Sequence, residues 1–195
     1  MIKPNKKYSD ILAAARVLFW KHGFKRVSVD EICKEAKASK MTFYKYFDNK
    51  TELAKTIFDN LVESGEKEFS QIVSSKISPT EKIKRIMLLK FEGTENISRE
   101  FINDFYLGSE TELKNFVEER TLKAWENIKK DYKSAQESGF IRKDLNVDFI
   151  IKVQFKMVEL LKDESTVKMF ESQQKMIIEL ATILVSGIVN DNYDK

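Results

Sequence analysis

Signals for the start and end of helices recur along the whole sequence and constrain its fold more than any other feature. The chain has two prolines, Pro4 and Pro79, and neither interrupts an apolar segment with helical spacing. Because proline is the residue least tolerated inside a helix, long helices are allowed over most of the chain. No segment shows the strict alternation that is typical of a strand. The sequence therefore predicts an all-α fold.

These signals predict about nine helices. Ser28 and Glu31 have the spacing of a capping box, in which each side chain binds an otherwise unpaired backbone N–H. Pro79 follows Ser78 at the first helical position, where proline is favoured. The expected helices end at Gly23, open at Ser28, Ser39 and Asn49, and then cover about residues 78–93, 98–107, 110–138, 146–160 and 171–190, with Gly108 and Gly139 as stops.

The composition excludes several classes of protein. No run approaches the roughly 18 apolar residues that cross a bilayer, and the N-terminus lacks the apolar core of a signal sequence. We therefore expect a cytoplasmic protein with no membrane partner. His22 and Cys33 are the single histidine and the single cysteine of the chain. No motif pairs a nucleophile with a base, so we expect no enzyme, no metal and no cofactor.

Positive charge is concentrated at the N-terminus. Residues 1–50 carry twelve lysines and arginines and five acidic residues, a formal charge of +7, whereas residues 51–195 carry −4. This asymmetry indicates that one end of the chain meets a polyanion such as nucleic acid. An uneven scatter of lysines is the alternative interpretation.

The segment ASKMTFYKYFDNK, residues 38–50, combines four aromatic residues with three lysines. On a helix, Phe43 and Phe47 fall four residues apart on one side and are expected to face inward. Residues on the other side and its borders suit phosphate oxygens and base edges; they are Lys40, Met41, Thr42, Tyr44, Lys45 and Tyr46. With the preceding helix this segment forms a helix-turn-helix, whose second helix enters the major groove of DNA. A short amphipathic helix without a DNA role is the alternative.

The residues from about 8 to 55 resemble the N-terminal signature of tetracycline-repressor-type (TetR-family) regulators. The matching features are the alanine-rich first helix, Gly23-Phe24, the two helix-opening serines, Thr42-Phe43-Tyr44-x-x-Phe47 and Asn49-Lys50-x-x-Leu53. The resemblance implies a homodimer on double-stranded DNA and a small-molecule effector held by the larger C-terminal domain. It implies phosphate contacts for Ser28 and Lys50, backbone contacts for Tyr44 and Tyr46, and operator reading by Lys40, Met41, Thr42 and Lys45.

One residue departs from the family pattern. The turn before the third helix usually has glycine where this chain has Lys37. If Lys37 adopts a left-handed conformation, we expect a cost of about 1 kcal/mol relative to glycine.

We expect two domains. Residues 1–50, here called the head, bind DNA, and residues 51–195 bind the ligand and dimerise. Aromatic residues of the second domain either line a ligand pocket or fill the core; the pocket candidates are Phe91, Phe105, Tyr106, Trp125 and Phe155.

The last two long helices are apolar on more than one side, which indicates a second packing partner. We expect this partner to be the same helix pair of a second subunit, and the alternative is burial inside one domain. The candidate interface residues are Phe149, Val153, Met157, Ile177, Leu180, Leu184 and Ile188.

Together these observations predict a ligand-responsive transcriptional regulator, most simply a repressor that a small hydrophobic effector releases from a pseudo-palindromic operator. The alternative is a DNA-binding dimer with a filled C-terminal core and no effector.

Overall fold

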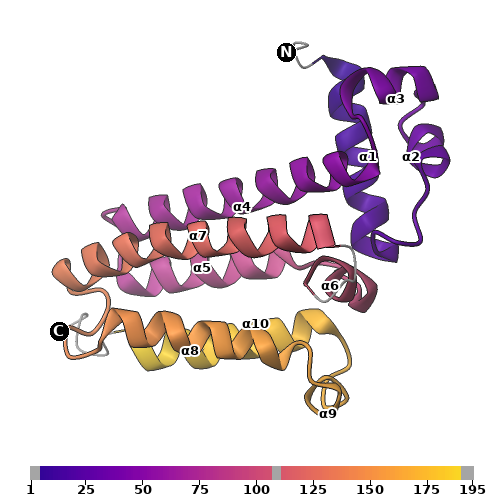
Figure 1. The fold of residues 1–195 in the computed structure, drawn as a ribbon. Coiled ribbons are helices and arrows are strands. Elements are labelled where there is room, and N and C mark those ends of the chain that lie inside the picture. The colour runs from indigo at the N-terminus through magenta and orange to yellow at the C-terminus, as the bar shows by residue number, and fades with distance from the viewer. Residues whose placement is uncertain (1–4, 107–110, 190–195) are drawn as a thin grey trace. The chain divides into compact units, whose positions relative to one another are not determined.

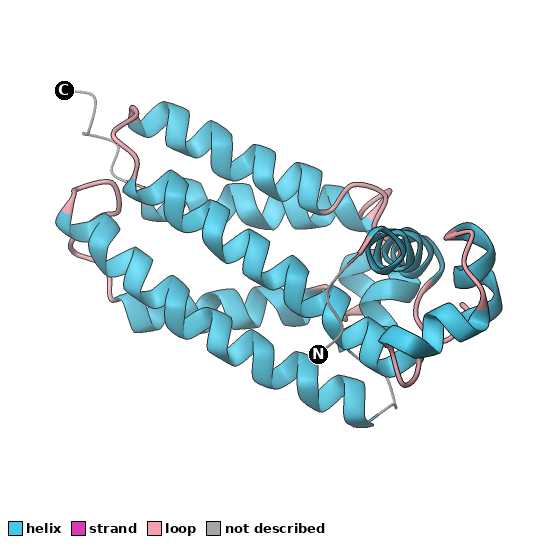
Figure 2. Cartoon of the chain, turned by 90° about the horizontal axis from the view of Figure 1, so that it is seen from above, coloured by secondary structure: helices cyan, strands magenta, loops and turns pink. Residues whose placement is uncertain are grey.

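The computed structural model of the protein describes residues 5–106 and 111–189. Over those residues the chain is helical, with short connecting loops (Figures 1 and 2). The helices are α1 (Lys6–His22), α2 (Val29–Glu35), α3 (Lys40–Tyr46), α4 (Lys50–Ser74), α5 (Pro79–Gly93), α6 (Arg99–Tyr106), α7 (Thr111–Glu137), α8 (Val147–Leu160), α9 (Glu164–Val167) and α10 (Gln173–Ile188). The all-α prediction is confirmed. None of these helices is long and apolar enough to cross a membrane.

The predicted helix starts coincide with side-chain caps. Ser28 and Glu31 form both hydrogen bonds of a capping box at the start of α2. Ser39, Ser78 and Asn146 cap α3, α5 and α8 in the same local way. The predicted stop at Gly108 lies outside the described residues. Helix α9 was not predicted, although a capping residue precedes this single turn.

The chain divides into two compact units. Unit 1 comprises Met1–Leu61 with Asn96–Arg120, and unit 2 comprises Val62–Glu95 with Thr121–Lys195. Helices α4 and α7 contribute to both. These units are defined by packing contacts. The boundary expected after residue 50 instead divides DNA binding from ligand binding and dimerisation, and it stays a prediction.

The core of unit 1 combines the head with α6. Ile11, Phe19 and Phe43 are fully buried. Helix α6 adds Phe105, also fully buried, whose ring lies 6.4 Å from that of Phe19. Trp20 of α1 accepts a backbone hydrogen bond of 3.0 Å from the N–H of residue 98 just before α6. Unit 1 is therefore one packed core that holds the three head helices.

Helices α4 and α7 run parallel in a fixed register. Three polar pairs join them, and in each pair the two residues are 61 positions apart. The pairs are Asp59–Arg120 in unit 1, and Glu66–Asn127 and Ser70–Asp131 in unit 2. A constant separation means that both helices advance in the same direction, because antiparallel pairs would show a changing separation.

The core of unit 2 lies where α5, α7, α8 and α10 meet. In Figure 1, α8 and α10 form one layer of this unit, and α5 lies with parts of α4 and α7 in the other. The buried cluster contains Val73, Ile86, Tyr132, Ala135, Phe140, Ile141, Val147, Ile150, Ile188 and Val189. Burial raises the pKa of Tyr132 to about 12, because the phenolate would be desolvated.

A buried lysine closes one end of this core. Lys82 is 6% exposed, and its Nζ donates a 2.6 Å hydrogen bond to the carbonyl of Val73 in the last turn of α4. The same ammonium lies 5.1 Å from the centre of the Phe140 ring. A cation at a helix C-terminus is favoured by the helix dipole, which offsets part of the desolvation cost. Burial lowers the pKa of Lys82 accordingly.

Candidate nucleic-acid interface

Helices α2 and α3 are joined by a tight turn at residues 36–38. The N–H of Lys37 donates to the carbonyl of Lys34 (3.2 Å), and the N–H of Ala38 donates to the carbonyl of Cys33 (2.9 Å). Lys37 has a φ of 48°, which is the left-handed region. Lys37, which replaces the usual glycine of the family, therefore adopts the left-handed conformation considered above. Lysine thus occupies a position of the turn at which glycine would be less strained.

Replacing Lys37 by glycine should stabilise the protein. We expect Lys37→Gly to raise the free energy of unfolding by about 1 kcal/mol, because glycine adopts a positive φ without steric cost. The hydrogen bond from Lys7 Nζ to the carbonyl of residue 37 is retained, since it uses the backbone. Urea denaturation measures the change. Lys34→Gly, in the last turn of α2, is the control and should lose stability; equal losses in both variants would contradict this account of the turn.

Helix α3 is anchored on one side and open on the other. Phe43 and Phe47 are 0% and 4% exposed, as predicted, and their rings lie 5.8 Å apart. Met41 is 85% exposed and Tyr44 is 54% exposed. The structure thus presents a short helix whose outer face has no packing partner among the described residues of the chain.

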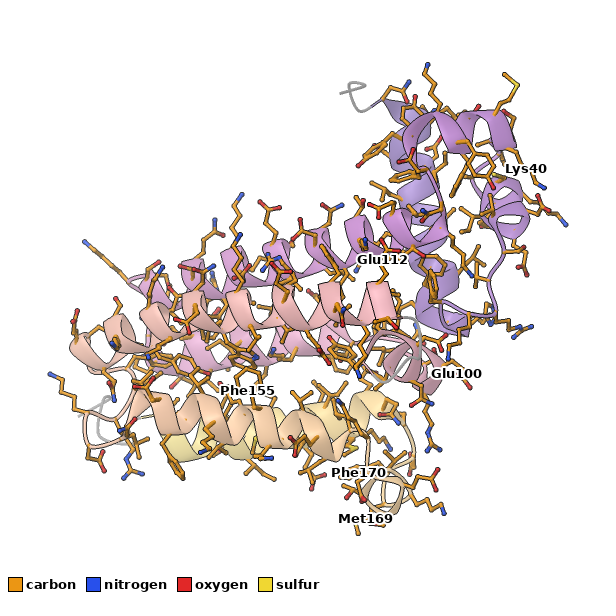
Figure 3. All side chains as sticks on the ribbon, viewed as in Figure 1. Lys40, Glu100, Glu112, Phe155, Met169 and Phe170 are labelled. Carbon is orange, nitrogen blue, oxygen red and sulfur yellow. The ribbon has the colours of Figure 1, made fainter. Side chains whose placement is uncertain are left out.

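The polar residues of this outer face make local contacts within the head. Lys45 is exposed, and its Nζ lies 5.9 Å from the centre of the Tyr46 ring. Lys40, labelled in Figure 3, pairs with Asp30 at 2.8 Å, and this partner raises the pKa of Lys40. Both side chains of that pair are mostly exposed, so it contributes little stability and can exchange for phosphate. The Thr42 hydroxyl is 2.9 Å from that of Ser39.

Ser28 and Lys50 have internal partners. The Ser28 hydroxyl donates to Glu31 Oε2 (2.8 Å) and accepts from the N–H of Glu31. The Ser28 N–H also donates to this carboxylate, and these bonds lower the pKa of Glu31. Lys50 Nζ donates to the carbonyls of Phe24 and Val27, both at 2.8 Å, and lies 4.3 Å from the centre of the Phe24 ring. Lys50 therefore ties the start of α4 to the loop before α2.

Tyr8 of α1 packs against the C-terminal end of α3 and was not singled out from the sequence. Its ring stacks on Phe47 at 5.3 Å and meets Tyr46 edge-on at 5.6 Å. Tyr46 is consequently half-buried, whereas Tyr44 is exposed. The available signal was spacing, since Tyr8 precedes the buried residues Ile11 and Ala15 at helical intervals.

The residues proposed for a ligand pocket fall into two groups. Phe105 and Tyr106 belong to unit 1, where Phe105 is fully buried and stacks on Phe101 at 4.3 Å. Phe91, Trp125 and Phe155 belong to unit 2. The rings of Trp125 and Phe155 lie 5.2 Å apart on α7 and α8, whereas Phe91 is 52% exposed. The structure therefore pairs Trp125 with Phe155 and uses Phe105 in the core of unit 1.

The residues proposed for a dimer interface differ in exposure. Phe149 is 66% exposed. Ile188 belongs to the buried cluster of unit 2, and Leu184 packs against that cluster. The other four are half-buried: Val153, Met157, Ile177 and Leu180. A further exposed apolar side chain on α10, Ile183 at 57%, was not among the candidates.

An all-α chain with a capped helix-turn-helix and an open, basic second helix has the architecture of a DNA-binding regulator. Residues 11–57 match the family described as bacterial regulatory proteins, tetR family. This match and the all-α fold support a TetR-family transcriptional regulator. A comparison with curated protein sequences finds no match.

Solved structures of regulators share the fold. The fatty acid degradation regulator FadR from Bacillus halodurans has a TM-score of 0.70 and 19% identity, covering 95% of this chain and 98% of that one. FadR from Bacillus subtilis, in complex with stearoyl-CoA, has a TM-score of 0.66 and 20% sequence identity. The match covers 93% of this chain and 99% of that one. A TetR-family regulator from Agrobacterium tumefaciens has a TM-score of 0.71 and 11% sequence identity. The match covers 96% of this chain and 100% of that one. At these identities the likeness establishes the fold.

Proposed function

We propose that the protein is a ligand-responsive repressor that binds a pseudo-palindromic operator as a homodimer. The observation that carries this proposal is the division of α3, whose Phe43 is fully buried while Met41 is 85% exposed. The buried ring holds the helix to the head, and the opposite face stays open to base edges in a major groove. Two heads related by a two-fold axis would reach successive grooves about 34–36 Å apart.

The proposed contacts are those that the resemblance to the TetR family implies. Lys40, Met41, Thr42 and Lys45 read the operator, and Tyr44 and Tyr46 contact the sugar-phosphate backbone. Ser28 and Lys50 contact phosphates by exchanging part of their internal hydrogen bonds. We infer no catalytic role, since the family and the structural neighbours are regulators.

Selection of DNA duplexes from a random pool tests this function. The purified protein is used at physiological salt with excess competitor DNA. Recovery of an inverted repeat supports a dimeric regulator. Recovery of salt-sensitive, sequence-independent binding would contradict operator recognition, because contacts to phosphate alone depend on salt and not on base sequence.

Two substitutions in α3 separate the proposed roles. We expect Tyr44→Phe to weaken binding to most sequences by about 2- to 10-fold, the value of one hydrogen bond. We expect Lys45→Ala to change which sequences are selected. Lys143→Ala, an exposed lysine of unit 2, is the control for charge. Unchanged affinity and preference in both α3 variants would refute the docking of this helix.

The effector we propose is an apolar molecule held by unit 2. The half-buried pair Trp125–Phe155 supports this, and stearoyl-CoA is the first probe because the Bacillus subtilis neighbour was solved with it. An effector releases DNA only if it binds the DNA-incompetent conformation more tightly. Release of the operator by stearoyl-CoA supports the proposal. Retention of DNA with every acyl probe favours the alternative, a dimer with a filled core and no effector.

A further inference from the structure

The first turn of α1 lies beside α3, although it is not part of the helix-turn-helix motif. The ring of Tyr8 stacks on that of Phe47 at 5.3 Å and meets that of Tyr46 edge-on at 5.6 Å. Lys7 Nζ donates a 2.8 Å hydrogen bond to the carbonyl of Lys37, in the turn that precedes α3. These contacts fix the start of α1 to the turn before α3 and to the end of α3, at the same end of the head (Figure 1).

This placement matters because α3 by itself fills a major groove. The major groove of B-DNA is about 12 Å wide, and an α-helix with its side chains is about 10–12 Å across. An element packed against the side of an inserted helix therefore lies over a sugar-phosphate wall of the groove, where contacts go to phosphate and not to base edges. The start of α1 and the turn at residues 36–38 are two such elements.

Each of these two elements carries an available lysine. Lys6, the first residue of α1, and Lys37 in the turn are both exposed. Neither ammonium has a hydrogen-bond or ion-pair partner among residues 5–106 and 111–189. Lys7 differs from them, because it pairs with Asp10 at 3.6 Å and binds the carbonyl of Lys37. Two lysines are thus open to a polyanion, and a third ties their segments together.

The backbone of Lys37 indicates that its side chain is used. In the part of the chain that the structure describes, Lys37 and Asn96 are the non-glycine residues with a positive φ, at 48° and 57°. Asparagine is common in the left-handed region, whereas lysine is strained there. Strained residues are concentrated at functional sites. A lysine at a position where glycine would be more stable therefore contributes something other than stability.

We propose that Lys6 and Lys37 contact DNA phosphates beside the groove that α3 enters, and that Lys7 positions their two segments. The proposal rests on the proposed function, because it assumes that α3 enters the groove. It extends the DNA-binding surface beyond α3 to the start of α1 and to the turn. Contacts to phosphate fix the orientation of the protein on the duplex and add affinity on every sequence.

The test measures how the DNA affinity of Lys6→Gln and Lys37→Gly depends on salt. The probes are the duplex recovered by selection and a random-sequence duplex of equal length, each titrated by fluorescence anisotropy from about 50 to 200 mM salt. Each lost phosphate contact should reduce the slope of log K against log[salt] by about 0.9 and lower the affinity by about 3- to 10-fold on both duplexes. The double variant should lose about twice the slope.

Lys37→Gly separates binding from stability, because the two expected effects have opposite signs. This variant should unfold at a higher urea concentration than wild type and bind DNA less tightly. Lys37→Arg keeps the charge and should keep the wild-type slope. Lys21→Gln is the matched control for Lys6→Gln, since it removes an exposed lysine from the last turn of the same helix and should leave the slope unchanged.

A wild-type slope in both Lys6→Gln and Lys37→Gly would overturn the proposal. An equal loss in Lys21→Gln would also overturn it, because net charge would then explain the effect. If the wild type selects an inverted repeat and these slopes do not change, the regulator stands and the role of the two lysines is refuted. If the slopes fall as expected but no sequence is preferred, the phosphate contacts stand and operator reading by α3 is refuted. Absence of DNA binding by the wild type would refute both.

Discussion

Gly23→Ala should destabilise the protein by about 2–6 kcal/mol. Gly23 ends α1 with φ 79° and ψ 167°, a conformation open to glycine and strained for any residue with a Cβ. An added Cβ would lie 2.6 Å from Asp104 Oδ2 and 2.9 Å from the Cβ of Glu100. Glu100, labelled in Figure 3, belongs to α6, and its backbone carbon is 3.1 Å from the same point. The helix itself would therefore have to move.

The displaced contacts hold α6 to the head. Asp104 Oδ2 accepts a 2.9 Å hydrogen bond from the N–H of Lys25, and its side chain is 12% exposed. Trp20 and Phe101, whose ring centres lie 4.4 Å apart, form the apolar part of this contact. Pushing α6 away from Gly23 would weaken both. The effect is expected to be large because conformational strain and steric overlap act at one residue.

Urea denaturation of Gly23→Ala and Gly65→Ala measures this difference. Gly65 lies inside α4 with open space around the position of an added Cβ, so alanine there should stabilise the helix by about 0.5–1 kcal/mol. The double variant Gly23→Ala/Asp104→Ala should recover only part of the loss, because Glu100 remains in place. A Gly23→Ala protein as stable as wild type would refute the close approach of α6.

Phe149→Asp should convert the proposed dimer into monomers. Phe149 is 66% exposed in the isolated chain and lies in the first turn of α8, where an acidic residue is favoured. The fold of the monomer should therefore tolerate the change. In a symmetric interface the substitution would bury two carboxylates without partners, at several kcal/mol each. We expect the dimer dissociation constant to rise by at least about 100-fold.

Sedimentation measures this change in mass. Val17→Asp is the matched control, because Val17 is an apolar residue of similar exposure, 61%, that lies on α1 in the head. Binding to the full operator should fall with dimer dissociation, since each monomer brings a single head. A Phe149→Asp protein that remains dimeric at the same concentration as wild type would exclude this face of α8 from the interface.

The parts of the fold that could be predicted are those set by contacts between residues three or four positions apart. Ser28, Ser39 and Asn146 cap helices because each side chain reaches a backbone N–H three residues ahead, a contact that depends on nothing distant. The burial of Phe43 beside the exposure of Met41 follows from helical spacing in the same way. Helix α9 was missed because a single turn has no apolar period to recognise.

Distant contacts explain what was not predicted. Phe105 is a pocket candidate from the sequence, and the structure shows that α6 packs it into the core of unit 1 against rings of α1 and α4. Ile188 is an interface candidate from the sequence, and the structure shows that it belongs to the buried core of its own unit. In each case the residue type was compatible with both roles, and its partner comes from a part of the chain far away in sequence.

By itself, the sequence determined the helical class, the helix starts and the two faces of α3, because caps and helical periodicity act over three or four residues. Only the tertiary structure decided which residues meet. It set the parallel register of α4 with α7, the approach of α6 to Gly23 and the internal partners of Lys50. The reason is physical: a buried ring or an ammonium takes whatever neighbour the packed helices bring to it, and that neighbour is not encoded in local spacing.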